Sequence, residues 1–159
     1  MATSLLPVIG KPAPDFSLPS TTGERISLRQ FKGKKTVILY FYPKDETPGC
    51  TKQACAFREA FDEFENLNVE ILGVSTDSLE SHQSFKRRHI LPFTLLADED
   101  AAVSKAYGVY KQRNLYGKKY MGIERTTFVI DRTGRIAQIY PKVKVEGHIQ
   151  ELLEFLAED

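Results

Sequence analysis

The stretch Val37-Ile-Leu-Tyr-Phe-Tyr42 is an uninterrupted apolar run, rich in β-branched and aromatic residues. Such a run is typical of a strand that is covered on both faces, as at the centre of an α/β sheet. A polar turn, Pro43-Lys-Asp-Glu-Thr-Pro-Gly49, follows, and apolar residues then recur at helical spacing from Ala54 to Phe64. The stretch therefore predicts a buried strand, a tight turn and an amphipathic helix in succession.

The sequence on either side continues this alternation of strands and helices. Alternation of this kind predicts an α/β fold with parallel neighbouring strands. A hairpin near the C-terminus makes the sheet mixed, and a further β-hairpin is expected near the N-terminus. This arrangement matches a thioredoxin-like fold, with helices on both faces of a mixed central sheet. The expected elements are strands at Val69–Val74 and Thr94–Leu96, helices at Leu79–His89, Asp98–Tyr107 and Ile149–Leu156, hairpins at Phe16–Leu28 and Thr127–Ile139, and a tyrosine-rich loop at Tyr107–Tyr120.

The composition predicts a single domain over residues 1–159. Hydrophobic residues make up 42% of the chain and charged residues 27%, both ordinary for a globular protein. A chain of this length buries roughly 70% of its unfolded surface and needs no metal or disulfide to hold its core. The net charge of +1 gives no electrostatic reason to expect a nucleic acid or an anionic membrane as a partner.

The cysteine content indicates the compartment and the kind of chemistry. Cys50 and Cys55 are too few for a disulfide scaffold or a closed thiolate zinc site, so we expect no metal and no cofactor. The N-terminal stretch Met1–Gly10 lacks the features of a signal peptide, and no apolar run reaches the roughly 18 residues of a membrane span. A cytoplasmic location is therefore expected, where two close cysteines indicate redox catalysis rather than a structural disulfide.

Cys50 lies where the predicted strand passes into the helix. Ligands of open α/β sheets bind at the carboxyl ends of strands, and the free N–H groups of a helix N-terminus favour a thiolate. Thr47 is placed to offer its hydroxyl to the sulfur or to a bound oxygen, and Pro43 to shield one side from water. The alternative is that Cys50 is a small buried hydrophobe. The rigid, uncrowded turn formed by Pro48 and Gly49 favours the functional interpretation.

Cys55 lies five residues after Cys50 on the same predicted helix. At ~100° per residue it points about 140° away from Cys50, toward the polar side. The two α-carbons would be about 8.6 Å apart in an intact helix, whereas a disulfide requires at most ~6.8 Å. The cysteines can therefore pair only if the first turns of the helix unwind.

These residues resemble a known family. The spacing Pro43-xxx-Thr47-xx-Cys50 is the active-site pattern of the peroxiredoxins. The longer stretch Phe41-Tyr-Pro-Lys-Asp-Glu-Thr-Pro-Gly-Cys-Thr51 resembles the bacterioferritin comigratory protein subfamily, also called PrxQ. The resemblance covers nearly the whole chain and includes Gly10–Phe16, Gly73–Ser78, Phe93–Asp98 and Arg125–Asp131.

The resemblance implies a thiol-dependent peroxidase that reduces hydrogen peroxide and organic hydroperoxides. By this similarity Cys50 becomes a sulfenic acid, Cys55 resolves it as an intramolecular disulfide, and Arg125 lies beside the thiolate. The implied reductant is thioredoxin or a similar dithiol, and the implied state is a monomer. Arginine suits this role chemically, because it is a permanent cation that favours a thiolate and donates hydrogen bonds to peroxide oxygens.

The remaining polar candidates are expected at the surface. His82, His89 and His148 have no partners at metal-ligand spacing in the sequence. Asp45 and Glu46 are expected to be solvated turn residues.

Two other functions are compatible with a thioredoxin-like fold. A disulfide reductase normally uses a CxxC motif, and the CxxxxC spacing here argues against it. A non-catalytic chaperone or binding module would keep its function after its cysteines were alkylated. Peroxide consumption, insulin reduction and alkylation therefore separate the three hypotheses.

Overall fold

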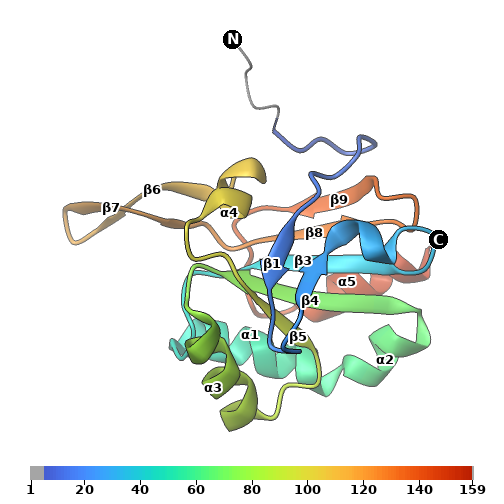
Figure 1. Cartoon of the computed structure of the whole chain (residues 1–159), viewed down its shortest axis with the longest axis horizontal. Helices are drawn as coiled ribbons and strands as arrows, with labels where there is room; N and C mark the ends of the chain where they lie inside the picture. The colour runs from blue at the N-terminus through green and yellow to red at the C-terminus, as the bar shows by residue number, and fades with distance from the viewer. Residues whose placement is uncertain (1–5, 159) are drawn as a thin grey trace.

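The computed structural model describes residues 6–158, and a five-stranded sheet forms its centre (Figure 1). The expected absence of a signal peptide concerns Met1–Gly10, of which residues 1–5 lie outside the described range. Within that range, no helix has both the length and the apolar character that crossing a bilayer requires. The elements are β1 (Ser17–Pro19), β2 (Arg25–Ser27), a 3₁₀ helix (Leu28–Phe31), β3 (Thr36–Phe41), α1 (Pro48–Glu59), α2 (Phe61–Asn66), β4 (Val69–Ser75), α3 (Leu79–His89), β5 (Thr94–Ala97), α4 (Ala102–Ala106), β6 (Tyr110–Leu115), β7 (Lys118–Ile123), β8 (Thr126–Ile130), β9 (Ile136–Tyr140) and α5 (His148–Ala157).

The central sheet is mixed, as the sequence predicts. Its strand order is β5-β4-β3-β8-β9, with β3, β4 and β5 parallel and β8 antiparallel to both of its neighbours. The apolar run of β3 lies at the centre, where Phe41 pairs with Val74 on one side and with Thr126 on the other. The carboxyl end of β3 therefore lies beside the start of β8.

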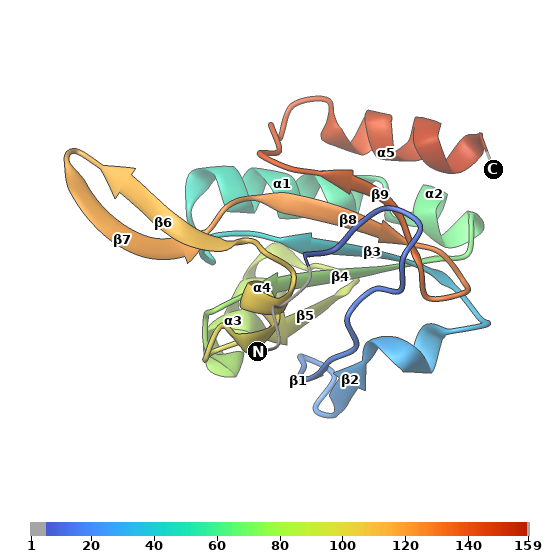
Figure 2. The same cartoon turned by 90° about the horizontal axis from the view of Figure 1, so that it is seen from above.

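Side chains of β3 alternate between two hydrophobic cores. Ile38 and Tyr40 pack against α1, α2, α3 and α5. Val37 and Leu39 face the opposite core, which the β1–β2 hairpin, the 3₁₀ helix and α4 cover (Figure 2). The predicted thioredoxin-like architecture, with an N-terminal hairpin and helices on both faces, is confirmed.

Two predicted helices differ from the structure. The helix expected to run on to Phe64 is divided at Ala60, where the backbone leaves the helical region and Glu63 N–H bonds the Ala60 carbonyl in a tighter, i→i+3 turn. The helix expected from Asp98 starts only at Ala102. The Asp98 carboxylate accepts from the N–H groups of Val103 and Ser104, so it caps α4 instead of belonging to it.

The segment expected as a loop after Tyr107 is largely a further hairpin, in addition to β1–β2 and β8–β9. β6 and β7 are joined by Tyr116 and Gly117, both with positive φ, as a two-residue hairpin turn requires. The sequence analysis missed these strands because they are mostly solvent-exposed and carry no apolar face. The hairpin projects beyond the end of the sheet at which α1 begins (Figure 2).

Candidate active site

The turn between β3 and α1 presents the first helical turn at the carboxyl end of β3. Thr47 precedes the helix with an extended backbone, and Pro48 occupies the first helical position, where its missing N–H costs nothing. The first helical hydrogen bond runs from Thr51 N–H to the Thr47 carbonyl at 2.9 Å. Cys50 therefore lies in the first turn, where helical N–H groups lack intrahelical partners and favour a negative charge.

Cys50 and Arg125 come together at this point. The Cys50 side chain is buried with 2% of its surface exposed, and Arg125 Nη2 donates to its Sγ at 3.4 Å. Arg125 directly precedes β8, and Thr126 of β8 pairs with Phe41 at the end of β3. The antiparallel pairing of β8 with β3 therefore brings Arg125 to the cysteine, as the resemblance implied.

Gln53 is a site residue that the sequence analysis missed. It lies one helical turn after Cys50 and is buried, and its Oε1 accepts from Arg125 Nη1 at 2.6 Å. Arg125 thus bridges the cysteine and the glutamine with its two terminal nitrogens. Among the described side chains, Gln53 Nε2 is buried without a hydrogen-bond partner. The i+3 spacing from Cys50 is the only signal in the sequence that places Gln53 on the same helix face.

Cys55 is half-buried on the same helix, and both cysteines are free thiols. Because α1 continues from Pro48 to Glu59 without interruption, helical geometry holds the two α-carbons about 8.6 Å apart. The two thiols therefore lie five residues apart on one intact helix.

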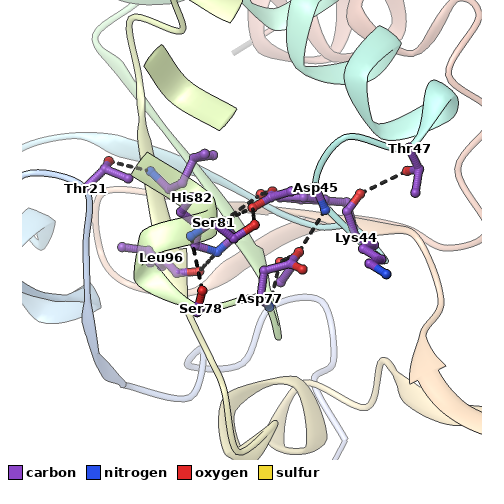
Figure 3. Close-up of polar contacts among 12 residues, drawn as sticks. Thr21, Lys44, Asp45, Thr47, Asp77, Ser78, Ser81, His82 and Leu96 are labelled. Atoms are coloured by element: carbon purple, nitrogen blue, oxygen red, sulfur yellow. Dashed lines mark hydrogen bonds and ion pairs between the residues drawn. The ribbon is translucent and has the colours of Figure 1, made fainter. Parts of the chain in front are cut away.

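Thr47 and Pro43 lie on either side of the turn. Thr47 Oγ1 donates to the Lys44 carbonyl at 2.9 Å (Figure 3), which leaves its lone pairs free to accept. Pro43 is half-buried. Together with Arg125 and residues 111–114 of β6, it lines an open cavity of about 480 Å³. Both residues are thus within the neighbourhood that the sequence predicts for them.

Three residues expected at the surface are buried instead. His82 and His148 are 0% and 1% exposed, and Asp45 is 5% exposed. His82 Nδ1 lies 2.7 Å from Asp45 Oδ2. His148 bonds Thr127 through Nε2 and Glu151 through Nδ1, at 2.9 Å and 2.7 Å. These contacts satisfy the polar atoms, which is what permits their burial.

Glu46 is exposed, as the sequence analysis expects. It is not a free solvated side chain, however, since its carboxylate pairs with His89 at 3.0 Å and with Arg88 at 3.5 Å. The turn is therefore attached to α3 through a charged side chain.

The tyrosines near the site are not acids or bases at neutral pH. Burial, and secondarily the nearby Cys50, raises the pKa of Tyr40 well above its usual value of 10.0. Burial likewise raises the pKa of Tyr42, with Tyr40 and Asp45 adding to the shift. Both hydroxyls therefore stay protonated at neutral pH.

Comparison with known proteins assigns the chain to a family. The sequence model of the AhpC/TSA family matches residues 9–139. The peroxiredoxin Bcp of Bacillus subtilis is 49% identical over 148 residues, which cover 93% of this chain and 94% of the relative. The chain belongs to the AhpC/TSA family, as a peroxiredoxin of the Bcp/PrxQ type.

Solved structures of this subfamily have the same fold. The PrxQ of Xylella fastidiosa superimposes with a TM-score of 0.90 at 35% identity, covering 97% of this chain and 98% of that one. The peroxiredoxin Q of Xanthomonas campestris gives a TM-score of 0.87 at 38% identity, covering 94% and 97%. This peroxiredoxin is therefore a thiol peroxidase that reduces peroxides, and the family resemblance found in the sequence is confirmed.

Proposed function

We propose that Cys50 is the nucleophile that attacks the peroxide and that Arg125 stabilises it as a thiolate. The observation that carries this proposal is the 3.4 Å contact from Arg125 Nη2 to Cys50 Sγ in a buried site. A guanidinium is charged at every physiological pH, and a positive charge this close favours the ionised thiol. The first turn of α1 adds partial positive charge from its N–H groups.

In the first step the Cys50 thiolate attacks the outer, proton-bearing oxygen of a hydroperoxide ROOH. The S–O bond forms as the O–O bond breaks, so the sulfur is oxidised to a sulfenic acid and RO⁻ leaves. Solvent protonates RO⁻ to an alcohol, or to water when the substrate is hydrogen peroxide. Arg125 donates to the leaving oxygen, Thr47 Oγ1 accepts from the peroxide O–H, and Pro43 shields the thiolate from bulk water.

In the second step Cys55 resolves the sulfenic acid. Its sulfur attacks Sγ of Cys50, the S–O bond breaks, and the leaving hydroxide is protonated to water as an intramolecular disulfide forms. The separation of about 8.6 Å in an intact helix exceeds the ~6.8 Å limit of a disulfide. The early turns of α1 must therefore open, which also brings the disulfide out of the core.

A dithiol protein such as thioredoxin then reduces the disulfide by two thiol–disulfide exchanges. The chain offers no third cysteine for this purpose. Organic hydroperoxides are included as substrates, since alkyl peroxide reduction is an activity of the X. campestris bacterioferritin comigratory protein. The open cavity beside Pro43 and Arg125 has room for an organic group. We assign this cycle to a monomer in the cytoplasm.

The test is peroxide consumption by the reduced enzyme with thioredoxin, thioredoxin reductase and NADPH. Turnover by the wild type and none by Cys50→Ser is expected, because a serine hydroxyl has no activated form near neutral pH. Retained peroxidase activity in Cys50→Ser would end the assignment of the nucleophile. Insulin reduction by the wild type at a comparable rate would favour a disulfide reductase, and partner binding that survives alkylation of both thiols would favour a binding module.

A further inference from the structure

The turn that precedes Cys50 is fastened to α3 by a buried carboxylate. Asp45 Oδ1 accepts from the Tyr42 hydroxyl at 2.6 Å, and Oδ2 accepts from the Ser81 hydroxyl at 2.8 Å. His82 Nδ1 lies 2.7 Å from the same Oδ2 (Figure 3). The backbone N–H of Asp45 donates to Asp77 Oδ2 at 2.8 Å. One residue of the turn is therefore held by four different side chains, two of them from the first turn of α3.

Both polar ends of His82 are bonded, one to β5 and one to the turn. His82 Nε2 lies 2.9 Å from the Leu96 carbonyl, which can only accept, so Nε2 carries a proton. The Tyr42 and Ser81 hydroxyls donate to the Asp45 carboxyl from two further sides. His82 and Asp45 therefore form a buried hydrogen-bonded pair between α3 and the turn.

The same atoms are poorly suited to holding a metal ion. Asp45, Asp77 and His82 lie close enough together to be considered as ligands. Both nitrogens of His82 are used, however, one by Leu96 and one by Asp45. A metal would need an unprotonated ring nitrogen. The hydrogen bonds of the cluster therefore leave neither nitrogen of His82 available to a metal. We call Asp45 with its hydrogen-bond partners the Asp45 anchor.

The anchor sits next to a backbone conformation that needs support. Glu46, which follows Asp45, has a φ of 65°, in the left-handed region that non-glycine residues rarely adopt. Such a conformation persists when surrounding contacts hold it in place. Here the Asp45 anchor holds it on one side, and the pairs of Glu46 with His89 and Arg88 hold it on the other. This turn of the backbone sets the direction in which Thr47 and the first turn of α1 leave the sheet.

We propose that Asp45 and His82 are positioning residues that hold the turn so that Cys50 faces Arg125 and the peroxide. In the described part of the chain, neither side chain forms a hydrogen bond or ion pair with Cys50, so their effect passes through the backbone of the turn. The inference rests on the proposed role of Cys50. It adds that α3, and not only α1 and β8, determines the reactivity of the thiolate.

Loss of the pair then lowers the fraction of molecules in the reactive arrangement. Removing one partner leaves the other as a buried polar group without compensation, which favours release of the turn. The observed rate with peroxide is the intrinsic rate multiplied by the fraction in the competent conformation. Release of the turn also makes Cys50 more accessible. At an alkaline pH that ionises the thiol with or without Arg125, a reagent that needs no oriented site should therefore react at least as fast as before.

The experiment compares two reagents on Cys50 in Asp45→Asn, in His82→Gln, in the double variant and in Ile130→Val. Ile130 is a buried residue paired with Val37 at the far end of β3, so Ile130→Val is a control for general loss of stability. We expect both single variants to react with hydrogen peroxide about tenfold more slowly than the wild type, and with iodoacetamide at the alkaline pH no more slowly. The double variant should be no slower than the slower single variant, because the pair acts as a unit. Ile130→Val should match the wild type with both reagents.

Wild-type peroxide rates in Asp45→Asn and His82→Gln would overturn the inference. So would a parallel loss of the peroxide and iodoacetamide rates, or an equal loss in Ile130→Val. Ser81→Ala removes one donor to Asp45 with little change in volume, and it decides the question if the other variants do not fold. Ser81→Ala is also expected to react with peroxide more slowly than the wild type, and an unchanged rate would contradict the proposal. Activity retained by Cys50→Ser would instead refute the proposed function itself.

Discussion

Gly49 lies directly against Arg125: a β-carbon on Gly49 would be 3.1 Å from Arg125 Nη2, the nitrogen that donates to Cys50. Contacts this short are tighter than nearly all real β-carbon contacts, so the guanidinium would have to move. The absence of a side chain at Gly49 therefore keeps Arg125 in reach of the sulfur.

Gly49→Ala should separate activity from stability. Alanine is the better helix former by up to about 1 kcal/mol, so thermal unfolding should occur at the wild-type temperature or above it. The reaction with peroxide should slow by about threefold or more, because displacement of a catalytic group by a fraction of an ångström weakens its contact with the transition state. Competition with a haem peroxidase measures this rate. A wild-type rate in a variant of normal stability would show that Arg125 tolerates the added methyl group.

Cys55→Ser should stop the cycle after one oxidation. Cys50 can still reach the sulfenic acid, but no second thiol in the chain can condense with it, and it remains open to further oxidation. Mass spectrometry after one equivalent of peroxide should show one added oxygen and no internal disulfide, and Cys55→Ala should behave in the same way. Thioredoxin-dependent turnover equal to the wild type would mean that Cys55 is dispensable and that the enzyme is of the one-cysteine type.

Oxidation should unfold the first turns of α1 without disturbing the sheet. Amide exchange in residues 50–58 should accelerate in the oxidised protein, while residues 37–41 of β3 remain protected, since local opening costs less than global unfolding. Peroxide-treated Cys55→Ser is the matched control, because it is oxidised but cannot form the disulfide, and it should keep its protection. Equal protection of α1 in reduced and disulfide-bonded protein would refute the unwinding mechanism.

His148 should make the folded state less stable in mild acid. Burial lowers its pKa from the usual 6.5, against an opposing contribution from Glu151. As the pH falls below about 6.5, the unfolded chain takes up a proton that the folded chain resists, so the free energy of unfolding decreases. The stabilisation is present above this pH and is lost as the pH falls.

Urea unfolding of the wild type and of His148→Gln at several pH values between about 7.5 and 5 checks this expectation. Subtracting the unfolding free energy of one protein from that of the other removes the contributions of the titrating groups that they share. As the pH falls, the unfolding free energy of the wild type should decrease more than that of the variant. A difference that stays constant across this range would show that His148 does not contribute to the acid sensitivity.

The features that the sequence predicts best are those that depend on neighbouring residues. The apolar run of β3, the turn and the start of α1 are contiguous, so the position of Cys50 at a helix N-terminus follows from local pattern alone. The contact with Arg125 depends on the pairing of β8 with β3, across 75 positions of the chain. Only the family resemblance provided it in advance.

The errors about the buried polar residues have a common physical cause. A histidine is buried when tertiary structure supplies partners for its nitrogens, and the partners of His82 include Asp45, 37 positions earlier. No local pattern contains that information, so His82, His148 and Asp45 all appeared to be surface residues. The β6–β7 hairpin was missed for a different reason. Its mostly exposed strands have no apolar alternation, which is the signal that identifies strands in a sequence.

Because Ala60 separates α1 from α2, the two helices need not melt and re-form as one unit. Ala60 links them through its own groups, with its N–H bonded to Ala56 and its carbonyl accepting from Glu63 and Phe64. Phe64 can thus stay in the core when α1 opens, as the proposed cycle requires. Helices of this size relax in about 1 μs or less, whereas enzymes commonly turn over about 1–1000 times per second. The helix–coil step of α1 by itself is therefore fast on the timescale of turnover.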